Sequence, residues 1–160
     1  MSVEIAIDRA VAGDAAAVAA LTGELLEEIM AVVGVKAFHF DLAEATARAQ
    51  EFLERDRYVA FLARAGGEPR EVGFVALCES WALYAEGAFG ILPELYVRPA
   101  YRSLGVGRAL IEAARAFGRA RGWTRLEVTT PSLPEFERTL QFYDREGFSI
   151  SGGRKLRARL

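Results

Sequence analysis

Residues 102–109 read Arg-Ser-Leu-Gly-Val-Gly-Arg-Ala and lie between an apolar run, 91–97, and an amphipathic stretch that begins at Val106. The two glycines let the main chain approach a ligand closely, and the first N–H groups of the following helix have no partner within it. Those donors and the positive end of the helix dipole form an anion site. Arg102 and Arg108 flank it with donors suited to phosphate oxygens. The sequence therefore predicts a strand, a phosphate-binding loop and a helix in this order.

The loop matches neither familiar nucleotide-binding fingerprint. It lacks the Lys-Ser/Thr ending of a P-loop and the third glycine of a dinucleotide-binding turn. A Gly-x-Gly taken alone is equally typical of a tight strand-to-helix turn, so its ligand has to be inferred from the rest of the chain.

The apolar periodicity predicts an α/β (α+β) fold, with a mixed sheet and helices on both faces. Pro93 interrupts the strand before the loop, which indicates a sheet edge or a bulge. We expect strands at 3–7, 58–65, 71–83, 90–97, 123–130, 148–150 and 155–159, and helices at 15–30 with Asp14 as N-cap, from Asp41, at 106–121 and at 134–146.

Composition narrows the class of protein. A chain of 160 residues suits one domain, residues 1–160. It has no apolar run long enough to span a membrane and no signal-peptide layout at its start, so we expect a cytoplasmic protein with no membrane partner. Cys78 and His39 are the only cysteine and histidine, which excludes an internal disulfide and a Cys/His metal cluster. We interpret Cys78 as a buried, inert thiol and His39 as structural or substrate-adjacent.

The charge is unevenly distributed along the chain. Through Val97 there are 7 basic and 16 acidic residues, whereas from Arg98 onward there are 13 basic and 6 acidic ones. A basic half that contains the phosphate loop suits a polyanionic cofactor, and an acidic half suits a cationic substrate. Nucleic acid is not an expected partner, because the arginines alternate with acids and not with exposed aromatics.

Residues 95–110, Leu-Tyr-Val-Arg-Pro-Ala-Tyr-Arg-Ser-Leu-Gly-Val-Gly-Arg-Ala-Leu, resemble the pyrophosphate-binding motif of the GNAT superfamily of N-acetyltransferases, Arg/Gln-x-x-Gly-x-Gly/Ala. Farther along, 142–148, Phe-Tyr-Asp-Arg-Glu-Gly-Phe, resemble the family's C-terminal Tyr-x-x-x-Gly-Phe element. Two motifs in the right order are more specific than one. The resemblance implies the GNAT-like fold, with a mostly antiparallel sheet of about six or seven strands, and acetyl-CoA as acyl-donor cosubstrate.

The resemblance also implies which residues hold that cosubstrate. Loop N–H groups would cradle the pyrophosphate, and the strand backbone would bind the pantetheine arm as an added strand does. The expected binding residues are Leu95, Tyr96, Val97, Arg102, Ser103, Leu104, Gly105, Val106, Gly107 and Arg108.

Glu94 is our candidate for the general base. It is expected to share a strand face with Leu92 and Tyr96 and precedes the cofactor-binding residues, where many family members place a Glu. A partly buried carboxylate there would take the ammonium proton directly or through water. The alternative is a solvated or ion-paired glutamate, and Glu79 and Glu127 are the reserve candidates.

Tyr143 matches the family's general acid, the phenol that protonates the coenzyme A thiolate. Its spacing from Phe136 and Leu140 equally suits a core tyrosine on an apolar helix face. Phe136 and Thr139 stand where the family often has an Asn and an Ala, so we expect the cofactor contacts to come from the loop more than from this helix.

These residues predict an N-acetyltransferase that acetylates a primary amine of a small molecule or peptide directly, through a ternary complex. The alternatives are a non-catalytic acyl-CoA sensor or regulatory module, and a protein lysine or N-terminal acetyltransferase. A homodimer is a further expectation from the resemblance. We expect substrate contacts from 24–40 and from the strand end at 81–88, with Glu28, Phe38, Phe40 and Trp81 as candidates; Glu24, Glu27 and Glu28 equally suit the solvated face of a helix.

Overall fold

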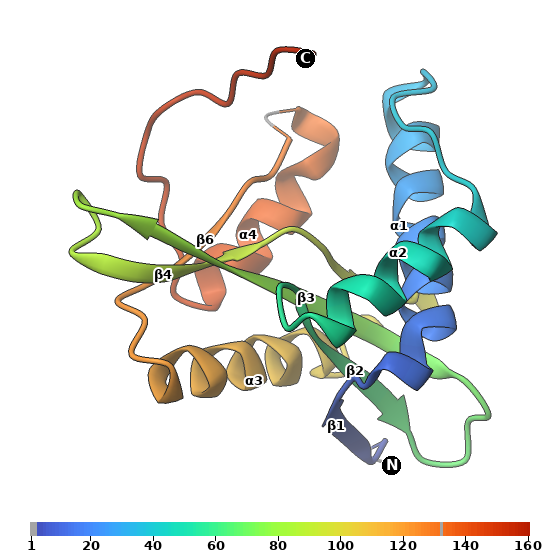
Figure 1. Ribbon diagram of the computed structural model, residues 1–160. Helices are drawn as coiled ribbons and strands as arrows, with labels where there is room; N and C mark the ends of the chain where they lie inside the picture. The colour runs from blue at the N-terminus through green and yellow to red at the C-terminus, as the bar shows by residue number, and fades with distance from the viewer. Residues whose placement is uncertain (1–2, 132) are drawn as a thin grey trace. The chain divides into compact units, whose positions relative to one another are not determined.

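The computed structural model describes residues 3–131 and 133–160, and its internal contacts divide the chain into two units, Met1–Thr129 and Thr130–Leu160. Figure 1 shows the helices and strands of both units. The elements of the first are β1 (Ile5–Arg9), a 3₁₀ turn (Ala12–Asp14), α1 (Ala15–Val33), α2 (Leu42–Glu54), β2 (Val59–Ala65), β3 (Glu71–Ala82), β4 (Gly87–Leu92), β5 (Leu95–Val97), a 3₁₀ turn (Pro99–Tyr101), α3 (Val106–Ala120) and β6 (Leu126–Val128). The second contains a 3₁₀ turn (Pro134–Phe136) and α4 (Glu137–Arg145).

The six strands form one sheet in the order β1-β2-β3-β4-β6, with β5 paired to β3. All pairs are antiparallel except β4 with β6, which is parallel. Figure 1 shows α1 and α2 on one face of this sheet and α3 on the other. The predicted mixed, mostly antiparallel sheet with helices on both faces is therefore confirmed.

Each face of the sheet has its own packing. On the α1/α2 face the core cluster consists of Ala10, Ala15, Val18, Leu21, Ala49, Ala60, Leu62, Phe74, Ala76 and Tyr96. On the other face, α3 buries Val106, Leu110 and Ala114, as its periodicity predicts. Gly118 makes room there for Trp123, because a Cβ on Gly118 would lie 2.9 Å from the Trp123 ring.

A bulge separates β4 from β5 along the same edge of β3. Ile91 opposes Cys78 and Leu95 opposes Val75, so three residues on one side face two on the other. The extra residue breaks the in-out alternation of the strand. Pro93 thus marks a bulge, as predicted, but the expectation that Glu94 shares a face with Leu92 is wrong. Of Leu92 and Tyr96, only Tyr96 lies on the same face of the sheet as Glu94.

The first two helices differ at their N-termini. The second helix was predicted to begin at Asp41, and this residue is its N-cap: its Oδ1 accepts the Glu44 N–H at 2.9 Å. Asp14 occupies the N-cap position of α1 as predicted, but its side chain accepts the N–H of Val11 at 2.9 Å and makes no capping hydrogen bond to α1. No helix in the described part of the chain is both long and apolar enough to cross a membrane.

In the second unit, α4 confirms the predicted final helix, whereas the two strands predicted at 148–150 and 155–159 are wrong. Residues 148–160 adopt neither helix nor strand. Ile150 and Leu156 are 81% and 88% exposed, so the alternation that suggested strands has no packed face behind it. The strand predicted at 123–130 is shorter than expected and covers only Leu126–Val128.

Candidate active site

The strand β5 has one edge that no described strand covers. The Ala76 N–H donates to the Glu94 carbonyl at 2.8 Å, and the Arg98 N–H donates to the Val72 carbonyl at 2.9 Å. In an antiparallel ladder this alternation turns the backbone groups of Leu95 and Val97 away from β3. Because β5 pairs with β3 only, the Leu95 N–H and carbonyl and the Val97 N–H are placed where an extended ligand arm can pair with them.

The glycine-containing loop leads directly into α3, as the sequence predicts. Gly105 is the N-cap residue of α3 with φ 85°, and Ser103 also has a positive φ, 63°. The first intrahelical bond of α3 comes from the Ala109 N–H, so the N–H groups of Val106, Gly107 and Arg108 precede it. A Cβ added to Gly105 would meet no atom within 4 Å. The N-terminus of α3 therefore adjoins exposed loop residues, Ser103 to Gly105, with open space at Gly105, as an anion site requires.

Two ion pairs join α1 to the segment that enters this loop. Arg98 holds both carboxylate oxygens of Glu24, with Nη2 2.9 Å from Oε2. Arg102 donates from Nη2 to Glu28 at 2.8 Å and from Nε to the Val97 carbonyl at 2.8 Å. Arg102 was expected at the phosphates and Glu28 at the substrate, and the structure instead pairs the two side chains with each other.

Glu94 lies on the α1/α2 face of the sheet, half-buried beside the open edge of β5. Its Oε2 accepts a hydrogen bond from the Tyr58 hydroxyl at 2.8 Å. Burial raises the pKa of Glu94, and the Tyr58 hydrogen bond offsets part of this by favouring the charged form. No described cationic side chain forms an ion pair with Glu94. A buried carboxylate without a cation is suited to accepting a proton from a ligand.

Glu79 and Glu127, the reserve candidates for the general base, have other hydrogen-bond and ion-pair partners. Glu79 accepts a hydrogen bond from the Trp123 indole N–H at 2.6 Å, which places it on the α3 side of the sheet. Glu127 forms an ion pair with Arg125, Nε to Oε2 at 3.2 Å. Glu94 is thus the one of the three carboxylates that combines burial with the absence of a described cation.

Tyr143 is described within the second unit, in the last turn of α4. Its ring is buried and contacts Phe142 and Phe148 edge-on, with centroid distances of 5.2 and 5.4 Å. Burial raises the pKa of Tyr143 above its ordinary value. The phenol therefore stays protonated at neutral pH and keeps a proton to donate.

The remaining expected substrate residues are dispersed. Phe40 packs on α1, where a Cβ on Gly23 would lie 2.6 Å from the Phe40 ring, while Phe38 is 36% exposed. Trp81 is 73% exposed, and the alternation of β3 places it on the face opposite Glu94. The single histidine, His39, is also exposed, with Nε2 3.6 Å from Glu44 Oε2.

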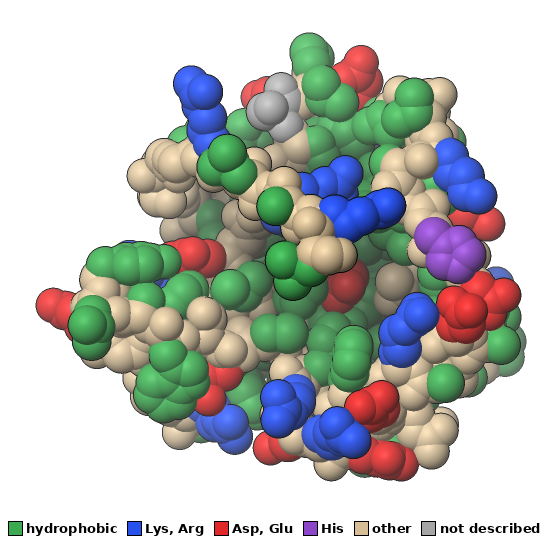
Figure 2. Space-filling model, turned by 45° about the horizontal axis from the view of Figure 1, so that its top comes forward, with side chains coloured by type: hydrophobic (Ala, Val, Ile, Leu, Met, Phe, Trp, Pro, Cys, Tyr) green, Lys and Arg blue, Asp and Glu red, His purple; other side chains and the backbone are tan. Residues whose placement is uncertain are grey.

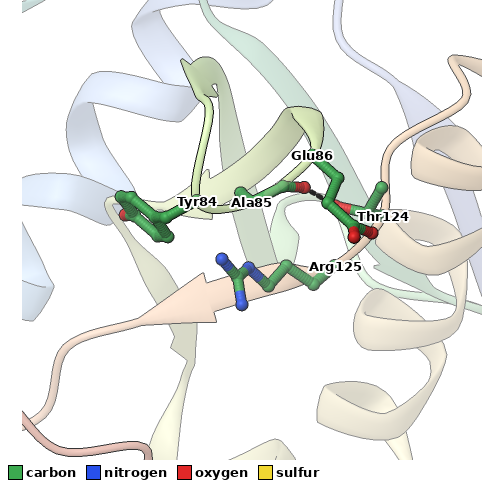
Figure 3. Close-up of a pocket in the computed structure, with 5 residues that line it drawn as sticks. All are labelled: Tyr84, Ala85, Glu86, Thr124 and Arg125. Atoms are coloured by element: carbon green, nitrogen blue, oxygen red, sulfur yellow. Dashed lines mark hydrogen bonds between the residues drawn. The ribbon is translucent and has the colours of Figure 1, made fainter.

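A small pocket lies where the turn between β3 and β4 meets the chain entering β6 (Figure 3). It is lined by Tyr84, Ala85, Glu86, Thr124 and Arg125, and the Thr124 hydroxyl donates to the Ala85 carbonyl at 3.0 Å. Its volume of about 210 Å³ is below the roughly 300–1,000 Å³ of typical ligand sites. We assign it no ligand.

Sequence reasoning missed Tyr58 and the Arg98–Glu24 pair. No local signal identifies Tyr58, because its contact with Glu94 depends on the pairing of β2, β3 and β5. The ion pairs did have a signal, since two glutamates and two arginines each recur at a spacing of four.

On the face drawn in Figure 2, acidic and basic side chains lie among one another, and neither sign of charge covers a large continuous area.

A family model described as an acetyltransferase (GNAT) domain matches residues 56–150. A search of curated proteins finds no match.

Several solved structures share the fold. The aminoglycoside N-acetyltransferase AAC(6')-Iy in complex with CoA superposes with a TM-score of 0.80 at 18% identity, over 99% of this chain and 97% of that one. An aminoglycoside acetyltransferase, meta-AAC0020, from an uncultured soil metagenomic sample, in complex with sisomicin, gives 0.76 at 20% identity, over 98% and 96%. A ribosomal-protein-alanine N-acetyltransferase from Brucella melitensis biovar Abortus 2308 gives 0.73 at 21%, over 98% and 99%. The family model covers more than half of the chain, which therefore belongs to the GNAT family of acetyltransferases.

Proposed function

We propose that this protein is a single acetyltransferase domain, residues 1–160, that transfers the acetyl group of acetyl-CoA directly to a primary amine of a small molecule or peptide. The observation that carries the proposal is Glu94, a half-buried carboxylate with no described cationic partner, located beside the open edge of β5. The ammonium group of an amine substrate is the cation that this carboxylate lacks. A cytoplasmic location and a homodimer remain expectations from the sequence.

The described residues fit an acyl-CoA. The outward backbone groups of Leu95 and the Val97 N–H suit the amides of the pantetheine arm, whereas the Val97 carbonyl already accepts from Arg102. The N–H groups at the start of α3 suit the pyrophosphate. Acetyl-CoA supplies an acetyl group activated as a thioester. Of the expected phosphate ligands, Arg102 would have to leave Glu28 to contribute its guanidinium. We therefore assign the pyrophosphate chiefly to the backbone of the loop.

The residues act in sequence in the proposed mechanism. Glu94 accepts the proton of the substrate ammonium directly or through water, which frees the nitrogen lone pair. The neutral amine attacks the thioester carbonyl carbon, a C–N bond forms and the C–S bond breaks. Tyr143, by its motif position, donates its proton to the departing thiolate. The nitrogen releases its second excess proton to water, and Tyr143 regains from water the proton that it gives up. Raising the pKa of Glu94 by burial brings the base toward the working pH, which suits this role.

Thermal unfolding tests the cofactor first. Acetyl-CoA and desulfo-CoA are expected to raise the Tm by several degrees, because a ligand at a hundred times its Kd stabilises the native state by about 2.7 kcal/mol. NAD is the matched control and is expected to cause no shift. Stabilisation by NAD alone, or no shift with either CoA compound, would contradict the proposal.

Thiol release then tests catalysis with two acceptors, sisomicin and a peptide that begins with alanine. The choice follows the solved structures above, which include aminoglycoside and ribosomal-protein-alanine acetyltransferases. Acetylation of either one supports the enzyme. Stabilisation by acetyl-CoA without thiol release for any amine tested would instead favour a sensor or regulatory module.

Replacing Tyr143 with phenylalanine is expected to lower kcat by about 100-fold and to leave the Kd for acetyl-CoA unchanged. The ring contacts with Phe142 and Phe148 persist in the variant, so its Tm should stay near that of the wild type. Steady-state kinetics and calorimetric titration measure the two quantities. An unchanged kcat would show that the thiolate departs without this phenol.

A further inference from the structure

Among the residues that the structure describes, Tyr58 alone makes a side-chain hydrogen bond to Glu94. It precedes β2 and lies 36 residues before Glu94 in the chain, yet its hydroxyl is 2.8 Å from Glu94 Oε2. Its ring contacts Phe52 of α2 with a centroid distance of 5.8 Å and packs against the core cluster of the α1/α2 face. The phenol is therefore held by both the helix layer and the sheet.

The direction of this hydrogen bond is fixed by the surroundings. Burial and the neighbouring Glu94 charge strongly raise the pKa of Tyr58, so the phenol keeps its proton and acts as the donor. The other titratable group that acts on this pair is Cys78 of β3, whose pKa is raised by burial and by Glu94. Glu24 and Glu28 of α1 are paired with Arg98 and Arg102.

The two oxygens of the Glu94 carboxylate differ. Oε2 is occupied by the Tyr58 hydroxyl, while Oε1 makes no hydrogen bond to any described residue. A carboxylate held at one oxygen loses rotational freedom, and its second oxygen remains available to a ligand. The contact also favours the ionised form that a base needs.

Building on the function proposed above, we propose that Tyr58 is the positioning residue of the catalytic base. It fixes Oε2 of Glu94 and leaves Oε1 to accept the proton of the acceptor ammonium. Tyr58 itself neither gains nor loses a proton in the reaction. Without it, the half-buried carboxylate would rotate more freely and hold its own proton to higher pH.

The variant Tyr58→Phe keeps the ring and removes the hydroxyl. Its matched control is Tyr101→Phe, which removes a phenol hydroxyl whose pKa is raised by a different carboxylate, Glu68. The first readout is the ¹³C titration of the Glu94 carboxyl carbon by NMR, with the resonance assigned by its loss in Glu94→Gln. The second is the pH profile of kcat/KM for sisomicin or the alanine peptide.

Tyr58→Phe is expected to move the Glu94 midpoint and the acidic limb of kcat/KM together to higher pH. On that limb the loss should be about tenfold or more, because a hydrogen bond to a charged group is lost, and it should shrink as pH rises. Tyr101→Phe should move neither readout. If Tyr58→Phe folds poorly, difluorotyrosine at position 58 gives a test of opposite sign, because its more acidic phenol should lower the Glu94 midpoint.

An unmoved Glu94 midpoint overturns the proposal even in an active enzyme. A loss of kcat/KM that is equal at every pH also overturns it, because that pattern reports only structural damage. A midpoint that moves in a protein that acetylates no amine would support the hydrogen bond and overturn the enzyme function itself. The failures of the two proposals are thus distinguishable.

Discussion

Replacing Glu94 with glutamine is expected to lower kcat/KM by about 10²–10⁴-fold, the range for loss of a general acid or base. Glutamine has nearly the same shape and can still bond to the Tyr58 hydroxyl, but it cannot accept the proton of an ammonium group. The Kd for acetyl-CoA should be unchanged, because the expected ligands of the cofactor are backbone groups of β5 and of the loop.

The same kinetics on Glu79→Gln and Glu127→Gln provide the comparison. These carboxylates are engaged by Trp123 and Arg125, and we expect each variant to retain most of the wild-type kcat/KM. Full activity in Glu94→Gln together with a large loss in one of the other two would reassign the base.

The pH dependence of stability gives an independent check on Glu94. Because burial raises its pKa in the folded state, the folded protein holds this proton at pH values where the unfolded chain has lost it. The contribution of Glu94 to stability therefore falls as pH rises from the unfolded pKa through the folded one. Glutamine removes that loss, so above the folded pKa the variant is expected to unfold at the same or a higher temperature. A lower Tm at every pH would show that the carboxylate stabilises the fold.

Replacing Gly105 with glutamate is expected to weaken acetyl-CoA binding by roughly 100-fold, the equivalent of losing about 2–3 kcal/mol. The new side chain places a negative charge at the N-terminus of α3, where the phosphates are proposed to bind. It also forces a residue with a Cβ into φ 85°, which costs about 1–2 kcal/mol.

Gly67→Glu is the matched control for this variant. Gly67 has φ 83°, and an added Cβ would meet nothing within 4 Å, so the strain, the open space and the added charge are the same as at Gly105. Gly67 lies in the turn between β2 and β3 and is not one of the loop residues 102–108. Calorimetric titration with acetyl-CoA should show weak binding for Gly105→Glu only. Equal affinities for both variants would remove the loop from the cofactor site.

The loop and its helix were predictable because their signals are local. Glycines at 105 and 107 and the periodicity that begins at Val106 specify a turn and an amphipathic helix from neighbouring residues alone. Local periodicity also made it possible to predict a mixed sheet with helices on both faces. Sequence motifs supplied the roles proposed for Glu94 and Tyr143, which stay predictions until the variants are measured.

The features that were missed depend on contacts between distant segments. Tyr58 meets Glu94 only after β2, β3 and β5 have paired, and Phe40 has a place on α1 only because Gly23 has no side chain. The prediction of the two C-terminal strands was wrong for the opposite reason. Alternation at 148–150 and 155–159 describes what a strand would look like, but a strand also needs a paired neighbour.

Because of the bulge at Pro93, the face of the sheet on which Glu94 lies depends on the number of residues between β4 and β5. The extra residue between Ile91 and Leu95 reverses which face each later side chain takes, so Glu94 and Tyr96 point toward the α1/α2 layer. Replacing Pro93 with another residue keeps the number of residues the same, so Glu94 and Tyr96 stay on the same face of the sheet. Deleting it would carry the carboxylate to the α3 side without altering any residue of the site. The chemistry of this strand is thus more tolerant of substitution than of a change in length by one.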